Sequence, residues 1–348
     1  MNPLSYSDVI QMNDVRNKIE NELKKHSGSQ TYSFKPTPKI LYKFCNFADY
    51  VIRNIEKDII SFSPIESLND TFDSSIHIVH DKQKIMQAVE SFPSSSEGIG
   101  IDRETWIQDW ISSEERIAKV RFSFASHIGV YVSCFSEIND STLMWSHYAD
   151  NNQGICVGYN FNLLESGTVF SNSLFPIMYS DSPINLKKYF NWDAYKYNYE
   201  AETGITIATL SKANCWRYEK EWRFIYAPPI NPHEKYLTPC YRIKPCSICL
   251  GHHFLKKFID IDDFSFKQNI DLTNRLFDMC EKNQISIYWM TTNIGSYNLV
   301  AKKMSLQKLK KFFSYLSKEK VIADRFYHVM QDEFLKCIED DVRIAHEA

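Results

Sequence analysis

Apolar side chains recur along the chain with two different spacings, which predict short strands alternating with helices. The run ILYKF at residues 40–44 has the length and composition of a strand. The next apolar residues recur at helical spacing and are Ala48, Val51, Ile52 and Ile55. The stretch IISFSPIESLNDTFD at residues 59–73 returns to a short strand, which Pro64 and an Asn-Asp turn interrupt. The first part of the core is therefore predicted as strand, helix, strand.

The interior of the chain continues this alternation. Strands are predicted where β-branched and aromatic residues cluster, at residues 129–136, 154–160 and 221–227 and in the runs SICLG and ISIYWMT. Helices are predicted, with loops between them, at residues 81–127, 141–150, 193–213 and 272–283. The interior has no stretch of linker-like composition, no internal repeat and no glycine-rich phosphate loop. We therefore expect residues 37–300 to form one α+β core domain with its strands in a shared sheet system.

Both ends of the chain differ from this core. Residues 1–36 are polar and contain one helical stretch. They end in a run that contains Gly, Ser, Thr and Pro. Residues 303–345 place apolar side chains on one stripe of a helix and charges of both signs elsewhere. We predict an N-terminal polar and helical arm at residues 1–36 and a C-terminal helical appendage at residues 301–348.

The composition is that of a chain that folds, and it limits the classes of partner. Of the 348 residues, 44% are hydrophobic and 24% are charged, a balance that supports a buried core. The net charge of -3 gives no overall positive field, so any contact with nucleic acid would be local. Aromatic residues make up 14% of the chain, and their planar side chains stack on planar ligands as well as building cores.

The sequence also bears on the compartment. No stretch approaches the roughly 20 consecutive apolar residues that span a bilayer, and the start MNPLSYSDVIQMNDV lacks a basic segment followed by an apolar run. The nine cysteines are scattered without the spacing of a disulfide framework, which is typical of free thiols in a reducing compartment. A cytoplasmic protein without membrane contact is predicted.

The densest group of candidate chemistry is the run WRYEKEWR at residues 216–223, where a loop enters a predicted strand. Glu219 and Glu221 lie two residues apart, and residues at this spacing share one face of a strand. Two carboxylates flanked by aromatic side chains could therefore point into one cleft. An exposed strand edge, on which arginine and glutamate pair in water, fits the same sequence.

A second group lies in the predicted helix STLMWSHYAD. His147 and Tyr148 can hold hydrogen bonds to a ligand, and Trp145 can stack on one. The alternative is a histidine whose hydrogen bonds are satisfied within an aromatic core. Ser61 and Ser63 form a third group because they alternate on a strand before a turn, where serine also serves as a turn or capping residue.

Two further patterns are weaker. Cys246 and Cys249, followed by His252 and His253, have one half of a zinc-ligand spacing, but no second pair lies at the usual separation. We therefore expect no metal site. A short basic run at residues 302–311 fits a solvated helix face or a local contact with nucleic acid. Neither a Ser-His-Asp order nor an activated cysteine is recognisable.

Four segments together resemble a bacterial family of unknown function, domain-of-unknown-function family 2971 (DUF2971). They are ILYKF, SFSPIESLNDTFD, CFSEINDSTLMWSHYADNNQGICVGYNF, and KANCWRYEKEWRFIY followed by SICLG. The segments span about residues 40–290, and the combination of MWSHYA, GICVGY and YEKEWR carries most of the resemblance. The family implies no established reaction. Its members occur as lone bacterial proteins or near defence genes, which suggests an effector of phage-defence or toxin type.

A looser resemblance, in the order of elements only, is to ADP-ribosyltransferases. Their compact split sheet carries an aromatic or basic residue on the first strand, a serine or tyrosine on the next and a glutamate at the start of a late strand. The matching residues here are Tyr42 and Lys43, then Ser61 and Ser63, then Glu219 and Glu221. Lys43 stands where histidine or arginine is usual, and the segment with His147 and Tyr148 is an addition. The resemblance implies a single split sheet, mixed or antiparallel, surrounded by helices.

This second resemblance implies that NAD is the substrate and is cleaved between nicotinamide and ribose, through an oxocarbenium-like transition state. Glu221 would bind a ribose hydroxyl and stabilise the developing positive charge, and Glu219 would position the acceptor, a protein or a nucleic acid. His147 is the third predicted catalytic residue. The predicted NAD-binding residues are Tyr42, Lys43, Ser61, Ser63, Trp145 and Tyr148.

Two other functions stay open at this point. One is a nuclease effector in which His147, Glu219 and Glu221 surround a metal ion. The other is a ligand-sensing module without catalysis. A regulatory partner protein is compatible with each of them.

Overall fold

The structure is a computed structural model of the chain. The residues that it describes are 36–70, 72–74, 130–163, 173–182, 185–186, 199–226, 240–259, 261–293, 295 and 297–319, with short stretches at 17, 19–21, 90, 104–109, 111–113 and 116. The predicted arm at residues 1–36 and the predicted helices at residues 81–127 lie almost entirely outside this set.

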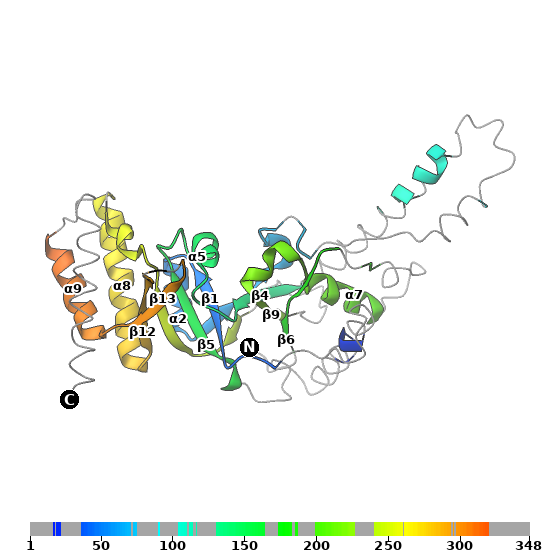
Figure 1. Cartoon of the computed structure of the whole chain (residues 1–348). Helices are drawn as coiled ribbons and strands as arrows, with labels where there is room; N and C mark the ends of the chain where they lie inside the picture. The colour runs from blue at the N-terminus through cyan, green and yellow to red at the C-terminus, as the bar shows by residue number, and fades with distance from the viewer. Residues whose placement is uncertain are drawn as a thin grey trace, which may run out of the picture.

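Nine of the described strands form one mixed sheet (Figure 1). Eight follow one another in the order β13-β12-β11-β5-β1-β4-β9-β6, and β3 pairs with β4. Among these strands β11 and β12 run parallel and the other neighbours are antiparallel. Their bounds are β1 Ile40–Cys45, β3 Ser63–Pro64, β4 Tyr131–Ser136, β5 Ile155–Asn160, β6 Leu174–Pro176, β9 Glu221–Tyr226, β11 Pro245–Leu250, β12 Ser286–Thr292 and β13 Leu299–Lys303.

The sheet is split between β1 and β4. Each of these strands pairs along its whole length with its other neighbour, β1 with β5 and β4 with β9. With each other they share a single register pair, Tyr42 and Ser136. The two strands therefore diverge beyond this pair. The prediction of an α+β fold with a mixed or antiparallel sheet and surrounding helices is confirmed. The strands near residues 40, 130, 155 and 221 share this sheet, as predicted.

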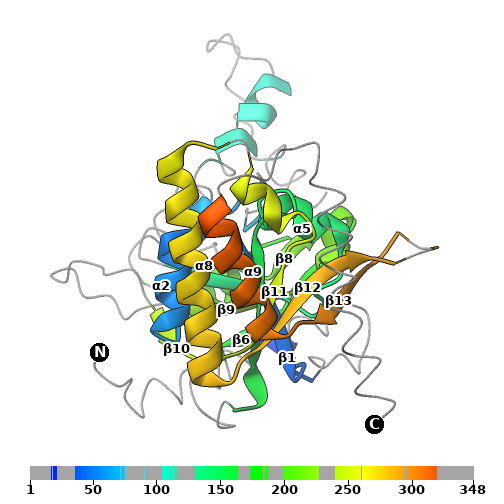
Figure 2. The same ribbon diagram turned by 90° about the vertical axis from the view of Figure 1, so that its left-hand side faces the viewer.

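One face of the sheet carries the largest core. Three helices cover it, α2 (Asp49–Glu56), α8 (Asp263–Asn283) and α9 (Leu306–Glu319), as the two views in Figures 1 and 2 show. Apolar residues from every layer meet there, including Leu41, Val157, Trp289, Ile52, Leu276 and Phe313. α8 begins where the Asp262 side chain accepts hydrogen bonds from two backbone N–H groups of the first turn, the usual N-cap arrangement.

The opposite face carries two smaller cores. Under α5 (Thr142–Tyr148), Trp145 packs with residues from β5, β11 and β12 such as Cys156, Cys249 and Met290. Near α7 (Tyr199–Thr209), Ile207 packs with Val132 of β4 and Ile225 of β9. The first core lies beside the β1 half of the sheet and the second beside the β9 half, so the split separates them.

Two short strand pairs lie outside this sheet, and the described elements also include the 3₁₀ helices η1 (Ile65–Ser67), η3 (Phe161–Leu163), η5 (Asn214–Glu219) and η6 (Phe254–Phe258). β2 (Ile59–Ser61) pairs with β10 (Cys240–Arg242), and β7 (Met178–Ser180) runs parallel to β8 (Ser211–Ala213). The prediction of a continuous helix over residues 193–213 is wrong at its end, because α7 stops at Thr209 and β8 follows. The hydroxyl groups of Thr209 and Ser211 donate hydrogen bonds to helix carbonyls four residues earlier, and pairing with β7 then replaces the helical bonds.

An exposed ion-pair group joins α2 to α8. The Arg275 guanidinium donates two hydrogen bonds to the Glu56 carboxylate, at 2.9 and 2.8 Å, and one to Asp49 at 2.8 Å. Its side chain is 30% exposed. The two helices are therefore held by charges at the surface as well as by apolar packing below.

The predicted division into arm, core and appendage stays a prediction. β13 crosses the predicted boundary at residue 300, and α9 lies within the predicted helical region 303–345, whose remainder from residue 320 onward is outside the described set. Phe313 of α9 belongs to the main core. Within the described part of the chain, no helix is long and apolar enough to cross a membrane.

Candidate functional site

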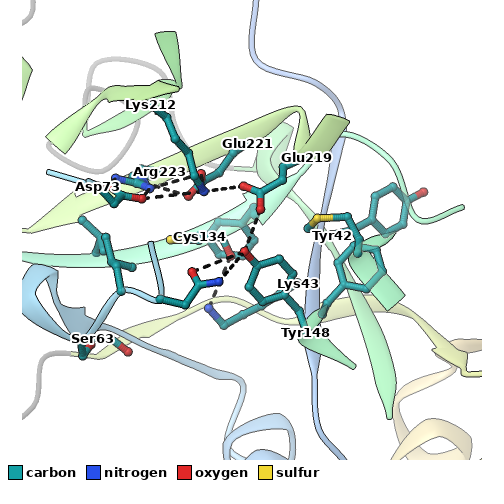
Figure 3. Close-up of a pocket in the computed structure, with 17 residues that line it drawn as sticks. Tyr42, Lys43, Ser63, Asp73, Cys134, Tyr148, Lys212, Glu219, Glu221 and Arg223 are labelled. Atoms are coloured by element: carbon teal, nitrogen blue, oxygen red, sulfur yellow. Dashed lines mark hydrogen bonds and ion pairs between the residues drawn. The ribbon is translucent and has the colours of Figure 1, made fainter. Parts of the chain in front are cut away.

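A pocket of about 330 Å³ lies at the split between β1 and β4 (Figure 3). It is bounded by elements from both halves of the sheet, by α5 and by the chain after β3. Its lining residues with polar side chains are Tyr42, Lys43, Ser63, Ser67, Asn69, Asp73, Cys134, Tyr148, Lys212, Glu219, Glu221 and Arg223. The pocket therefore combines charged groups from segments that are far apart in the sequence.

The β9 wall of the pocket follows from strand alternation. Glu221 and Arg223 lie two residues apart and point to the pocket, whereas Trp222 and Phe224 point to the main core on the opposite face. A charged residue at every second position, with aromatic residues between, thus places an acid and a base side by side on one face. Both side chains are buried, Arg223 completely.

Arg223 holds the deepest part of the charge cluster. Its Nε and Nη2 atoms donate hydrogen bonds to the two oxygens of Glu221, at 2.8 and 3.2 Å. Its Nη1 and Nη2 atoms donate to the two oxygens of Asp73, at 2.7 and 2.5 Å, and Nη1 also donates to the carbonyl of Thr209 at 2.6 Å. The planar guanidinium therefore makes paired hydrogen bonds with two carboxylates at once.

Lys212 is the second buried cation, and β8 positions it. Its Nζ atom donates to Glu219 at 2.5 Å and to Glu221 at 3.0 Å. The same atom lies 4.9 Å from the centre of the Trp216 ring, a cation–π distance. The cluster thus contains three carboxylates (Asp73, Glu219, Glu221) and two cations.

Glu219 connects this cluster to α5. Its Oε1 atom accepts a hydrogen bond of 2.7 Å from the Tyr148 hydroxyl, and the Asn69 amide donates to the same hydroxyl at 3.2 Å. The backbone around Glu219 is fixed as well, because its carbonyl accepts from the Ser136 hydroxyl at 2.6 Å. The hydrogen bond from Tyr148 to Glu219 joins α5 to the WRYEKEWR run.

The two glutamates differ in their proton affinity. Burial alone would raise the pKa of Glu221, but the Arg223 and Lys212 charges outweigh it and lower that pKa to about 2. For Glu219, burial and the charge of Glu221 raise the pKa above its usual value, and Lys212 offsets this only in part. Burial and the charge of Glu219 also raise the pKa of the Tyr148 hydroxyl. Glu221 is therefore ionised at neutral pH, and Glu219 is the carboxylate closer to accepting a proton.

Lys43 reaches into the gap between β1 and β4. Its Nζ atom donates to the Ser133 hydroxyl at 2.9 Å and contacts the Cys134 carbonyl at 3.5 Å, both on β4. It also lies 5.2 Å from the centre of the Phe135 ring. Among the described residues no carboxylate pairs with it, in contrast to Lys212 and Arg223.

α5 carries Tyr148 and is fixed at both ends. The Ser141 hydroxyl accepts a hydrogen bond from the backbone N–H of Met144, as an N-cap does. The fully buried Trp145 ring donates from Nε1 to the Asn139 carbonyl at 2.7 Å and packs edge-on against Phe44. These contacts determine where the following turn of the helix places Tyr148.

The turn after α5 has an uncommon backbone. Asp150, Asn151 and Asn152 all have positive φ, at 48°, 53° and 68°, a conformation that asparagine and aspartate tolerate better than most residues. Gly251 packs against this turn so closely that a Cβ atom there would collide with the Asn152 carbonyl. The turn therefore locks the end of α5 against the end of β11.

The structure brings most, but not all, of the predicted site residues to the pocket. Six line it, namely Tyr42, Lys43, Ser63, Tyr148, Glu219 and Glu221. Trp145 is instead buried beneath α5, and Ser61 lies in β2 within reach of Asn54. His147 is exposed, with its ring near those of Tyr148 and Trp216. The roles assigned to all of these residues stay predictions.

Three residues of the charge cluster were not predicted, namely Asp73, Lys212 and Arg223. Arg223 was visible only as a neighbour in the WRYEKEWR run, where alternation with Glu221 was the available signal. Lys212 was hidden by the incorrect extension of α7 into β8. Asp73 lies 150 positions from Arg223, and nothing in the local sequence marks the pair.

The residues with half of a zinc-ligand spacing, Cys246, Cys249, His252 and His253, do not come together as a metal site. Cys246 contacts the Gly158 carbonyl, Cys249 accepts from Asn139, and His252 Nδ1 lies 3.2 Å from the Met290 carbonyl. Within the described part of the chain, no group of three or more His, Cys, Asp or Glu side chains could hold a metal ion. The free thiols there include Cys45, Cys134, Cys156, Cys215, Cys246, Cys249 and Cys280.

Fold and site define a mixed α+β protein with a charged pocket at a split in its sheet. Residues 144–224 match the model of a family described as "Protein of unknown function (DUF2971)", in agreement with the resemblance seen in the sequence. The matched segment runs from α5 to β9 and supplies Tyr148, Lys212, Glu219, Glu221 and Arg223 to the pocket. No curated protein and no solved structure matches the chain.

Proposed function

We propose that this pocket binds NAD and cleaves the bond between nicotinamide and ribose, as an enzyme of ADP-ribosyltransferase type. The observation that carries the proposal is a pair of buried carboxylates, Glu219 and Glu221, whose pKa values are moved in opposite directions while both line one pocket. Titratable groups pushed apart in this way are the usual arrangement for an acid–base or charge-stabilising pair.

Glu221 supplies a fixed negative charge in this proposal. Breaking the nicotinamide bond develops positive charge on the ribose, as in glycoside hydrolysis. A carboxylate with a pKa of about 2 stays ionised throughout, and Arg223 and Lys212 hold it in place without reorganisation. Preorganised charge of this kind is among the largest contributions to catalysis.

Glu219 takes the part of the proton acceptor. Each of its oxygens accepts one hydrogen bond, from Tyr148 or from Lys212. A carboxylate has about four acceptor positions, so capacity remains for a hydroxyl group in the pocket. Its raised pKa brings it closer to the operating pH, where a general base is most effective.

Lys43 is the residue proposed to bind the pyrophosphate. It lines the pocket, is partly buried and has no carboxylate partner in the described part of the chain. An ammonium group that bonds a hydroxyl and a carbonyl but no carboxylate is suited to an anionic ligand group. The volume of about 330 Å³ lies at the small end of ligand sites, so one half of a dinucleotide would occupy it.

An enzyme that consumes NAD harms the cell in which it acts, because it depletes the NAD of the cytoplasm. The proposal therefore includes a role as a bacterial effector, of phage-defence or toxin type, restrained by a partner until needed. The sequence feature behind this role is the resemblance to DUF2971, which implies an effector, and residues 144–224 match the model of that family.

The test is release of nicotinamide from NAD by the purified chain. Glu221→Gln keeps the shape of the side chain and removes its charge, and we expect the rate to fall about 10²–10³-fold with the fold retained. Glu66→Gln is the matched control, because Glu66 is an exposed glutamate close to the pocket. Full activity of the Glu221 variant would contradict the proposed role.

A ligand-sensing module is the second candidate. The observation that favours it is that every oxygen of Glu219 and Glu221 already accepts a hydrogen bond within the protein. Such a module would be stabilised against heat by NAD without releasing nicotinamide. The nuclease alternative stays a prediction.

A further inference from the structure

We propose that Tyr179 is a positioning residue of this site, which fixes the backbone of Glu221 and thereby aims its carboxylate. The inference rests on the proposed function, in which Glu221 stabilises the charge that develops on the ribose. Tyr179 is not among the described residues that line the pocket. It therefore acts through Glu221 and not on the substrate.

Glu221 lies where the pairing between β6 and β9 ends. The last register pair joins Pro176 to Trp222, and one step further the backbone N–H of Ile177 still donates to the Glu221 carbonyl at 2.9 Å. Two residues that face each other in this way in an antiparallel ladder normally exchange both backbone hydrogen bonds. Here the N–H of Glu221 donates instead to the Tyr179 hydroxyl, at 2.8 Å. A side chain thus replaces the ladder bond at the residue that carries the carboxylate.

The chain leaves β9 at this point, where β7 pairs with β8. The backbone N–H of Met178 donates to the Leu210 carbonyl at 2.8 Å, and Tyr179 is the register partner of Lys212. Side chains of register partners lie on the same face of a sheet, so Tyr179 and Lys212 approach Glu221 together. Tyr179 holds its backbone, and Lys212 holds Oε2 at 3.0 Å. One two-stranded unit therefore fixes both the backbone and the carboxylate of the same residue.

The Tyr179 side chain is itself held in place. It is half-buried, and the guanidinium carbon of Arg217 lies 5.9 Å from the centre of its ring. The Nε atom of Arg217 in turn donates to the Asn214 side chain at 2.7 Å. Burial raises the pKa of the Tyr179 hydroxyl above its usual value, so the group is neutral at neutral pH. It is therefore a fixed, uncharged acceptor for the N–H of Glu221.

The first test is Tyr179→Phe, which keeps the ring and its contact with Arg217 and removes the acceptor. A displacement of about 1 Å at a reacting centre can cost 10²-fold in rate, so we expect kcat for nicotinamide release from NAD to fall about 10–10²-fold. Because the charge of Glu221 acts in the transition state, kcat/KM should fall by the same factor. Tyr50→Phe is the matched control, since the Tyr50 hydroxyl also makes one hydrogen bond, to Asn46 at 2.8 Å, but at the surface of α2. Its rate should be unchanged.

The second test combines Tyr179→Phe with Glu221→Gln. If Tyr179 acts through the charge of Glu221, the double variant should release nicotinamide at the same rate as Glu221→Gln alone. The fall in melting temperature caused by Tyr179→Phe should persist, because the backbone N–H of residue 221 still loses its partner. A tyrosine that only stabilises the fold would instead lower the rate by the same factor in both backgrounds.

Hydrogen exchange at the Glu221 amide provides a measurement without substrate. Mass spectrometry with fragmentation to single residues should show faster exchange in Tyr179→Phe and unchanged exchange in Tyr50→Phe. If melting shows that Tyr179→Phe has not folded, Arg217→Met replaces it, because Arg217 is exposed and its loss frees one side of the Tyr179 ring. We then expect a smaller fall in rate that disappears in the Glu221→Gln background, and a fall that persists there would overturn the inference.

The outcomes separate this inference from the proposed function. An unchanged rate in Tyr179→Phe, or an equal loss with and without the Glu221 charge, would overturn the role of Tyr179 and leave the proposed function standing. Absence of nicotinamide release by the original protein would overturn the proposed function and the part of Tyr179 in it. The exchange measurement would still decide whether the hydroxyl holds Glu221, and unchanged exchange in Tyr179→Phe would show that it does not.

Discussion

Two arginines of this protein each bind two carboxylates, one in a buried cluster at the pocket and the other at the surface. Arg223 binds Glu221 and Asp73 through paired hydrogen bonds at the pocket, and its side chain is 0% exposed. Arg275 binds Glu56 and Asp49 at the outer surface of α2 and α8, and it is 30% exposed. Arg223 also makes more hydrogen bonds, since it pairs with both carboxylates and bonds the Thr209 carbonyl, but burial is the larger difference between the two groups.

The difference in burial determines what each group of charges contributes to the stability of the fold. Surface ion pairs gain little because water solvates and screens each partner, so the Arg275 group adds only modestly to the packing of α2 on α8. Charges removed from water lose that solvation, and replacing a buried ion pair by apolar residues is often neutral or stabilising. Five charged side chains beside a pocket are therefore better explained by a function of the pocket than by the stability of the sheet.

The strongest test of this comparison removes each arginine in turn. Arg223→Met leaves Glu221 and Asp73 buried without their main partner, and we expect the free energy of unfolding to fall by about 3–5 kcal/mol. Arg275→Met should lower it by no more than about 1 kcal/mol, because its partners stay solvated. Urea denaturation followed by circular dichroism measures both.

The two variants control for each other, since the substitution is the same and each arginine binds two carboxylates, one group buried and the other at the surface. Equal losses of stability in both would show that burial does not separate the two groups. An Arg223 variant that does not fold would agree with the expected direction, and measuring Arg223→Lys, which keeps the charge and loses the planar fork, would then supply the magnitude.

A second test uses pH. The pKa of Glu221 is lowered from 4.5 to about 2 in the folded state, so its contribution to stability is complete above pH 4.5 and is lost as the pH falls towards 2. A shift of this size corresponds to about 3 kcal/mol. Glu219 has the opposite sign, because its raised pKa favours the protonated folded state at low pH. We therefore expect Glu221→Gln to flatten the loss of stability between pH 4.5 and 2.

Glu56→Gln is the matched surface variant for this measurement. Arg275 also lowers the pKa of Glu56, but that carboxylate is solvated, so the acid limb should change much less. The free energy of unfolding measured by urea at several pH values from 7 to 2.5 gives both curves. An acid limb that is the same in the Glu221 variant and in the original protein would contradict the proposed ionisation of Glu221.

The fold was the more predictable part of the molecule. Contiguous apolar runs such as those of β1, β5 and β9 mark buried strands whatever their partners are, and the Ser141 cap marks the start of α5. The end of α7 was mispredicted because residues 205–213 continue an apolar pattern, whereas the strand β8 depends on pairing with β7. Such pairing is tertiary and leaves no local periodicity.

The candidate site was predictable only where its residues are neighbours in sequence. Glu219, Glu221 and Tyr148 stood out because they lie in dense polar and aromatic runs. Lys212 and Asp73 did not, since each is a single charge in an ordinary segment whose partner comes from elsewhere in the fold. Trp145 looked like a stacking residue for the same local reason, and its burial under α5 is a property of the packed sheet.

The last prediction concerns salt, for which we expect the smallest effect on stability. It is also the prediction most specific to the contrast between the two arginines. At 1 M salt the screening length falls to about 3 Å, which suppresses attraction between solvated charges and leaves buried pairs largely unaffected. The loss of stability caused by Arg275→Met should therefore shrink from at most about 1 kcal/mol at low salt to within measurement error at 1 M NaCl. The loss caused by Arg223→Met should persist, because the side chains of Arg223, Asp73 and Glu221 are almost fully buried and buried pairs are screened much less than exposed ones. Salt also strengthens or weakens hydrophobic burial, so each variant is compared with the original protein at the same salt concentration and only the differences are used. If the Arg223 difference shrank with salt as the Arg275 difference does, the cluster would have to be reached by solvent ions, and the contrast between the two arginines would fail.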